Sequence, residues 1–192
     1  MRSTSLAALL IGLGIGFAIM YPLMKKRAPQ VLSAMPVPFV PSSASGADAS
    51  PPPMDIRRFN QLQETVAKDP MNFDALVELG NMQSDQRHFP EAAEWYTKAL
   101  AVRESVDVRK YLGIALYNAN RVDDAIAQFR KALETDPSNP EALYDLGVAL
   151  LEGKNDADGA IEMWETLIRL NPNYAGNDVV RRNIQAVKEN RQ

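Results

Sequence analysis

The distribution of hydrophobic residues divides the chain into three parts. Residues 6–24 form one uninterrupted apolar run, and residues 28–53 show no periodic pattern. Beyond residue 53, apolar residues recur at helical spacing along several amphipathic segments. An unbroken run of this length is typical of a membrane span, whereas amphipathic periodicity is typical of helices that bury one face. The pattern therefore predicts an N-terminal anchor, a linker and an all-α domain.

The apolar run consists of 19 residues and is followed directly by Lys25, Lys26 and Arg27. As a helix it would extend roughly 28 Å, close to the thickness of a bilayer's hydrocarbon core. We therefore predict one transmembrane helix within an anchor segment of residues 1–27. A glycine-rich phosphate loop would have to follow a strand. A cleaved signal peptide would need small residues where this chain has Tyr-Pro-Leu-Met.

Small residues recur every fourth position in this run, at Ala8, Gly12 and Gly16. This spacing places them on one helix face and would allow two copies of the chain to pair as a homodimer. The alternative is that glycine is simply frequent in membrane spans.

Residues 28–53 contain seven prolines and are rich in serine and alanine. Proline removes backbone donors and fixes φ, so we predict a disordered, flexible linker with partly polyproline-II character. The alternative is that its proline clusters are themselves a ligand for a proline-reading domain.

The remainder of the chain contains three similar segments, which begin at Phe73, Val106 and Pro140. A Leu-Gly pair recurs at spacings of 33 and 34 residues, and the alanine that opens the second half of each segment recurs at 33 and 35, with one extra residue in the third segment. The recurring small residues are Gly80, Ala92 and Ala99, then Gly113, Ala125 and Ala132, then Gly147 and Ala160. Because these residues are small, the two helices of each segment can pack closely, with large residues such as Tyr96, Phe129 and Trp164 around them.

These positions resemble the tetratricopeptide repeat (TPR), a helix–turn–helix unit of about 34 residues. The resemblance implies a right-handed solenoid of paired antiparallel helices across residues 54–192. It divides that region into a partial repeat helix (54–70), repeats one to three (73–105, 106–139 and 140–173) and a capping helix (175–192).

The resemblance also implies a concave groove for a protein or peptide partner, lined by the first helix of each repeat. The groove positions are Val77, Asn81 and Ser84, then Lys110, Ile114, Tyr117 and Asn118, then Tyr144, Val148 and Leu151. Tyrosine often anchors such interfaces. The alternative is that the apolar members pack against neighbouring helices, or against a capping helix folded into the groove.

Charge and composition exclude several other functions. The chain holds 21 basic and 24 acidic residues, of which four and one precede residue 54, which leaves a net charge of −6 on residues 54–192. That balance does not favour a nucleic-acid partner. There is no cysteine, and the only histidine, His88, lies in a predicted turn. We predict no catalytic residues, no metal site and no cofactor, so the chain is not expected to be an enzyme.

The sequence therefore predicts a membrane-tethered TPR scaffold or adaptor. Two alternatives remain: a self-associating structural subunit, and an accessory or chaperone factor resembling the TPR proteins of cytochrome c biogenesis. The layout is typical of a single-pass protein of the bacterial inner membrane. Lys25, Lys26 and Arg27 favour a cytoplasmic TPR domain. The usual layout of exported, anchored proteins favours a periplasmic one, and both stay open.

Overall fold

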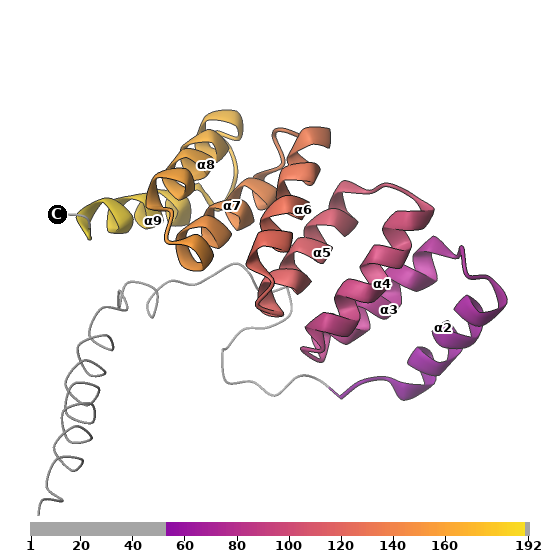
Figure 1. Cartoon of the computed structure of the whole chain (residues 1–192). Helices are drawn as coiled ribbons and strands as arrows, with labels where there is room; N and C mark the ends of the chain where they lie inside the picture. Colours follow the sequence, from indigo (N-terminus) through magenta and orange to yellow (C-terminus); the bar gives the residue numbers. More distant parts are fainter. Residues whose placement is uncertain (1–52, 191–192) are drawn as a thin grey trace, which may run out of the picture. The chain divides into compact units, whose positions relative to one another are not determined.

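The computed structural model describes residues 53–190 (Figure 1). In this range the chain is helical, with eight α-helices and one π-helical turn and no strand. The α-helices are α2 (Ile56–Lys68), α3 (Phe73–Asp85), α4 (Phe89–Val102), α5 (Val106–Asn118), α6 (Val122–Thr135), α7 (Pro140–Val148), α8 (Ala157–Leu170) and α9 (Asn177–Glu189). The predicted all-helical solenoid is therefore confirmed for these residues.

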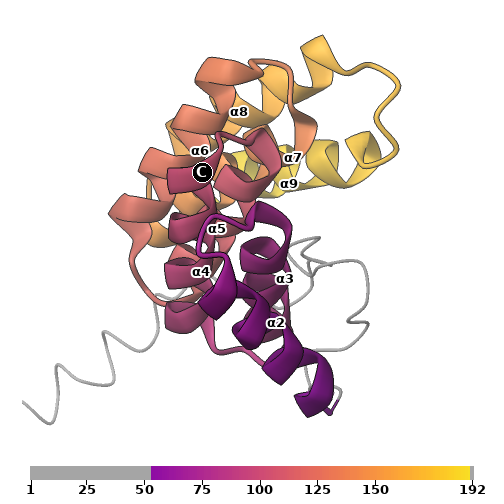
Figure 2. The ribbon, with the colours of Figure 1, turned by 90° about the vertical axis from the view of Figure 1, so that its right-hand side faces the viewer.

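The helices are arranged as successive antiparallel pairs. Within a repeat α3 packs on α4, α5 on α6 and α7 on α8, and α4 and α6 each contact the first helix of the next repeat. In Figure 2, α4, α6 and α8 form one layer and α3, α5 and α7 lie beside them. We call α3, α5 and α7 the A helices and α4, α6 and α8 the B helices.

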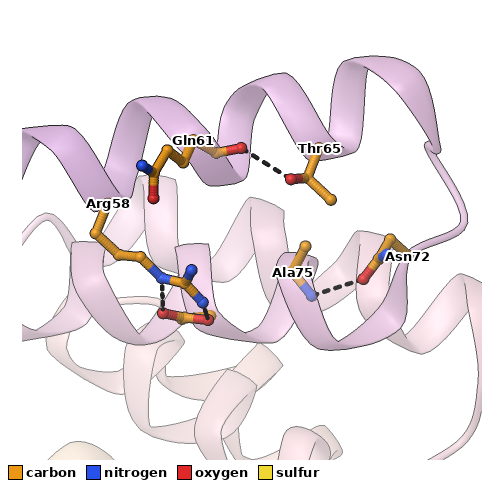
Figure 3. A network of polar contacts seen from close by, with 6 residues as sticks. Arg58, Gln61, Thr65, Asn72 and Ala75 are labelled. Carbon is orange, nitrogen blue, oxygen red and sulfur yellow. Dashed lines mark hydrogen bonds and ion pairs between the residues drawn. The ribbon is translucent and has the colours of Figure 1, made fainter.

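Side-chain caps define where the A helices begin. The side chains of Asn72, Ser105 and Asn139 accept hydrogen bonds from the backbone N–H three residues later, at the starts of α3, α5 and α7. Figure 3 shows this for Asn72, whose Oδ1 lies 3.0 Å from the amide of Ala75. Each cap satisfies one of the orphan N–H groups of a helix start, which is why asparagine and serine are favoured there.

The turn within each repeat contains one residue with a left-handed backbone, and these are Arg87, Asn120 and Asn155. In repeats one and two a backbone bond closes the turn over five residues, from His88 N to Gln83 O and from Arg121 N to Leu116 O. In repeat three the equivalent bond runs over six residues, from Asp156 N to Leu150 O. The extra residue of repeat three therefore lies between Leu150 and Asp156.

The chain absorbs this extra residue in a π-helical turn, η3 (Ala149–Gly153), which continues α7. A π-turn holds one more residue than the α-turn it replaces, so the two helices of the repeat keep their pairing. A Cβ at Gly153 would lie 2.4 Å from Val122 Cγ1, so this position requires glycine.

The repeat glycines lie directly against aromatic rings of the B helices. A Cβ at Gly80 would approach the Tyr96 ring to 2.5 Å, one at Gly113 would approach Phe129 to 2.5 Å, and one at Gly147 would approach Trp164 to 2.3 Å. Such distances are shorter than any allowed carbon contact, so only glycine permits this approach. The alanines of the pattern, Ala92, Ala99, Ala125, Ala132 and Ala160, are all fully buried.

At the C-terminal end α9 covers the last repeat, and Val180, Ile184 and Val187 join the main hydrophobic core. Within residues 53–190 no helix is long and apolar enough to cross a membrane. The predicted membrane helix with its basic flank, the linker up to residue 52, and the dimer positions Ala8, Gly12 and Gly16 lie outside the described residues.

Candidate protein-binding face

We call the surface of α3, α5 and α7 that is turned away from the B helices the A-helix face. In repeat one it carries Asn81, which is exposed, and Val77 and Ser84, which are half-buried. Tyr96 donates a hydrogen bond of 2.8 Å from its hydroxyl to Asn81 Oδ1. Asn81 therefore has one side-chain oxygen already engaged, while its amide nitrogen remains available for other contacts.

Repeat two supplies the most polar part of the face. The Lys110 side chain is 12% exposed, and its Nζ lies 3.6 Å from Asp107 Oδ1 and 3.8 Å from Glu141 Oε2. Tyr117 donates a 2.8 Å hydrogen bond from its hydroxyl to Glu152 Oε2 in η3. Burial and this bond raise the pKa of Tyr117. The π-turn thus brings an acidic side chain to the tyrosine of the neighbouring repeat.

The other two predicted residues of repeat two differ in exposure. Ile114 is half-buried and packs against the main core. Asn118 is exposed, and its Nδ2 donates to the Ile114 carbonyl at 2.9 Å. Asn118 therefore lies at the open edge of the face, where a partner could reach it.

Repeat three is the most closed part of the predicted groove. Tyr144 and Val148 are 3% and 4% exposed, and Leu151 is half-buried. The Tyr144 hydroxyl accepts a 3.1 Å hydrogen bond from Asn183 of α9, and burial raises the pKa of Tyr144 to about 12. Tyr144 and Val148 thus pack inside the solenoid rather than line an open surface, as expected if the capping helix covers this end.

The position two residues before each repeat glycine also matters, and it is not among the predicted groove positions. It holds Glu78 in repeat one, Tyr111 in repeat two and Asp145 in repeat three. Tyr111 is 36% exposed, and its ring centroid lies 5.9 Å from that of Tyr96. It is the most accessible tyrosine of α5 and can offer an aromatic contact to a partner.

Glu78 is bound by an arginine of the preceding helix. Arg58 of α2 donates from Nε and Nη2 to the two carboxylate oxygens of Glu78, at 2.6 and 2.5 Å. Figure 3 shows the guanidinium of Arg58 turned from α2 toward α3. The two-pronged bond lowers the pKa of Glu78 and accounts for both of its oxygens.

Asp145 occupies the equivalent position of α7 and has a different environment. It is 4% exposed, and within residues 53–190 its carboxyl has neither a hydrogen bond nor an ion pair. Burial raises the pKa of Asp145 well above its usual range, and the positive charge of Lys110 opposes that shift. Buried carboxyl groups are nearly always paired, so an unpaired one requires an explanation.

Further acidic groups surround Asp145. Glu141, one turn earlier on α7, raises its pKa, and Asp145 and Glu152 both act on Tyr144. We call the group formed by Asp107, Glu141, Asp145 and Glu152 the acidic patch; Lys110 is the cation that contacts it. Asp107 and Glu141 lie within 4 Å of the Lys110 ammonium group, and Glu152 accepts a hydrogen bond from Tyr117. With more acids than cations, the patch favours a further positive charge over a negative one.

One sequence signal could have revealed Asp145. It is the single charged residue in the stretch from Ala142 to Leu151, where its neighbours are apolar or glycine apart from Tyr144. A lone acid in a helix segment that is buried on most sides has either a structural partner or a functional role. Periodicity alone could not distinguish these two cases.

The structure also contains a cavity of about 500 Å³ on the side of the B helices. It lies between α4 and α6 and is lined by Pro90, Ala93, Glu94, Thr97, Lys98, Leu112, Leu116, Arg121, Asp124 and Gln128. None of the ten predicted groove residues lines it.

Within residues 53–190 the histidine and the acidic residues at helix starts occupy structural positions. His88 precedes α4, and its Nδ1 lies 2.9 Å from Gln83 Oε1. Asp156 caps α8, and Asp123, Asp124 and Asp158 lie in first helical turns, where negative charge favours the helix dipole. Across residues 53–190 no group of three or more His, Asp or Glu side chains could hold a metal ion.

A family model for the tetratricopeptide repeat matches residues 60–105 and 112–175. These ranges make up more than half of the chain and include the repeat glycines and aromatic residues described above. The chain belongs to the tetratricopeptide repeat family.

Two curated relatives illustrate the range of proteins that contain similar repeats. A probable peptide N-acetylglucosaminyltransferase, SPINDLY of Hordeum vulgare, is 36% identical over 97 residues, or 46% of this chain and 10% of SPINDLY. The photosystem I assembly protein Ycf3 of Synechococcus sp. (strain WH7803) is 32% identical over 101 residues, or 44% of this chain and 58% of Ycf3. The matches thus span a tenth and just over half of these relatives.

Among solved structures, the fold is similar to that of YrrB, described as a TPR protein with an unusual peptide-binding site. The TM-score is 0.59 and the sequence identity 23%, with 71% of this chain and 70% of YrrB covered. At this identity the likeness shows a common fold.

Proposed function

We propose that this chain is a membrane-anchored TPR scaffold that binds a segment of a protein partner on its A-helix face. The observation that carries the proposal is the exposure of this face at repeats one and two, where Asn81, Tyr111 and Asn118 are exposed beside half-buried apolar residues. Such a mixture of aromatic, apolar and amide groups suits an extended peptide better than a small substrate.

The relatives support an adaptor over an enzyme. Ycf3 is an assembly protein, and YrrB carries a peptide-binding site. The SPINDLY match covers a tenth of a much longer protein, so it does not argue for glycosyl transfer here. Because a TPR solenoid offers a surface rather than a reaction centre, we propose that its role is to hold proteins together.

The proposed anchor is the apolar run of residues 6–24, which would place the scaffold at a bacterial cytoplasmic membrane. Fixing one component at a surface raises its effective concentration for other components there. Lys25, Lys26 and Arg27 support a cytoplasmic repeat domain, and the linker would let it reach up to about 80 Å from the bilayer in an extended form.

Site-specific photocrosslinking tests the binding face. A benzoylphenylalanine replaces Asn118 on α5 in one variant of the full chain, and Arg130, an exposed residue of α6, in the matched control. We expect discrete adducts with a partner protein from position 118 and none from position 130 in cells that express the chain. Equal labelling at both positions would contradict a preferred A-helix face.

Deletion of residues 6–24 tests the anchor separately. We expect the full chain to stay with the membrane fraction after alkaline carbonate extraction and the deletion variant to leave it. If the deletion variant also remains, the solenoid itself binds the membrane and the proposed anchor is dispensable.

The size of the full chain in detergent, with and without Gly12→Leu and Gly16→Leu, tests the alternative of a self-associating subunit.

A further inference from the structure

Asp145 has an internal counterpart that indicates what its position can bind. The same position of repeat one holds Glu78, and the guanidinium of Arg58 satisfies both of its carboxylate oxygens. Asp145 has no such partner within residues 53–190, although it is far more buried than Glu78. A carboxyl that is less accessible to water has more to gain from a charged donor.

Lys110 does not serve as that donor. Its Nζ lies 3.6 Å from Asp107 Oδ1 and 3.8 Å from Glu141 Oε2. Both distances are longer than a hydrogen bond. It lies close enough to lower the pKa of Asp145 but does not form an ion pair with it. The acidic patch therefore retains an excess of acceptors after its resident cation is counted.

The surroundings of Asp145 are built from several elements. Lys110 belongs to α5, Glu141 and Tyr144 to α7, and Tyr174 to the segment before α9, where Glu141 and Asp145 raise the pKa of Tyr174. The Glu141 side chain is half exposed and interacts with Asp145, so we call it the rim of the patch. A long cationic side chain can pass a charged rim and reach an acid below it with its terminal group.

We propose that the acidic patch receives an arginine or lysine side chain from the partner segment, with Asp145 as its buried acceptor and Glu141 as its rim. An arginine suits the site better than a lysine, because its planar fork can bond two oxygens as Arg58 does at Glu78. The proposal rests on the proposed function and adds to it the chemistry of the partner.

A selection experiment identifies the partner chemistry without a candidate partner. Phage that display random decapeptides are selected against the full chain in detergent micelles, and the bound peptides are sequenced. We expect arginine, and to a lesser extent lysine, to be enriched at one fixed position relative to the unselected library. Synthetic versions of the selected peptides then supply dissociation constants by fluorescence anisotropy.

A double-mutant cycle locates the contact. In the peptide the enriched arginine is replaced by citrulline, which keeps its shape and removes its charge. In the protein, Asp145→Asn keeps the shape of the buried acid and removes its charge. Glu141→Gln changes the exposed rim without affecting the core. Glu134→Gln, at an exposed position of α6, is the control. We expect Asp145→Asn and citrulline each to weaken binding about tenfold or more, with no further loss when combined.

The possible outcomes separate the inference from the proposed function. Selected peptides without a basic residue, or losses that simply add in the cycle, would overturn the arginine site while leaving a peptide-binding scaffold. Failure to select any peptide would count against both. An unchanged affinity for Glu134→Gln, together with a loss in Glu141→Gln, supports the site even if Asp145→Asn alters folding.

Discussion

Repeats one and three place an acid at the same position of the A helix and treat it differently. In repeat one Glu78 lies near the surface and is held by Arg58 of α2. In repeat three Asp145 is buried, and α7 continues into a π-turn. The two acids occupy the same repeat position, but side chains from neighbouring elements differ. Arg58 pairs with Glu78 and stabilises the fold, whereas Asp145 has no such partner and remains able to bind a ligand.

Gly147→Ala should have the largest effect, and Gly80→Ala a smaller one. Helix propensity alone would favour alanine by about 1 kcal/mol. The added Cβ would instead meet Trp164, which is 1% exposed and held by a bond from its Nε1 to the Tyr144 carbonyl. We expect a net destabilisation of about 2–3 kcal/mol, measured by urea unfolding of the full chain in micelles.

Gly80→Ala should cost less because the Tyr96 hydroxyl is bonded to the exposed side chain of Asn81, which can move with the ring, whereas Trp164 is bonded to a backbone carbonyl. Ala127→Val on the exposed surface of α6 is the control and should stay within about 0.5 kcal/mol of wild type. Equal costs at the two glycines would show that repeat three is no more rigid than repeat one.

Tyr144→Phe should destabilise the fold by about 1–3 kcal/mol. The change removes the acceptor of Asn183, which is 3% exposed and would be left with an unpaired donor. Amide exchange should show the loss mainly in α9. Tyr111→Phe, at an exposed position of α5, serves as the control, and an equal effect there would contradict the role of the buried hydrogen bond.

Asp145→Asn should stabilise the fold at pH 8, by on the order of 1 kcal/mol. Burial raises the pKa of Asp145 in the folded state, so its proton stabilises the fold below the unfolded value of about 4, and this contribution is lost as the pH rises toward the folded value. The gain should therefore shrink between pH 8 and pH 4. Lys110, Glu141 and Tyr174 face the same group and are present in both the wild type and the variant, so the difference between the two reports on residue 145.

Arg58→Met should have the smallest effect on stability, because both partners are substantially exposed and water screens their attraction. Its effect on stability should have the opposite sign to that of Asp145→Asn and should likewise shrink as the pH falls. The pKa of Glu78 is lowered in the folded state, so the pair stabilises the fold above the unfolded value of about 4.3, and the contribution is lost as the pH falls. Unfolding at pH 7 and pH 3, each with and without 1 M salt, measures it; a larger cost at pH 3 would contradict this assignment.

The solenoid was predictable because its determinants are local and repeated. Gly80, Gly113 and Gly147 recur with an aromatic residue 16 or 17 positions later, and that spacing specifies two close helices whatever surrounds them. The extra residue of repeat three was also visible in the spacing. Its accommodation as a π-turn was not, because an inserted residue can lengthen either a loop or a helix.

The accessibility of the predicted groove residues was not predictable from the sequence. Family positions place Tyr144 and Val148 on the A-helix face, but their burial depends on how α9 packs, with Asn183 lying 39 residues beyond Tyr144. Asp145 was not predicted as a site residue for a related reason. Its lack of a partner is a property of side chains from α5 and the segment before α9, which no local pattern describes.

The wide turn at Ala149–Gly153 makes repeat three tolerant of changes in chain length. A surplus residue is confined to one turn, and the bond from Asp156 N to Leu150 O restores the entry into the next helix. We therefore expect that one residue can be inserted or removed at this turn, close to Glu152, without displacing the helices on either side.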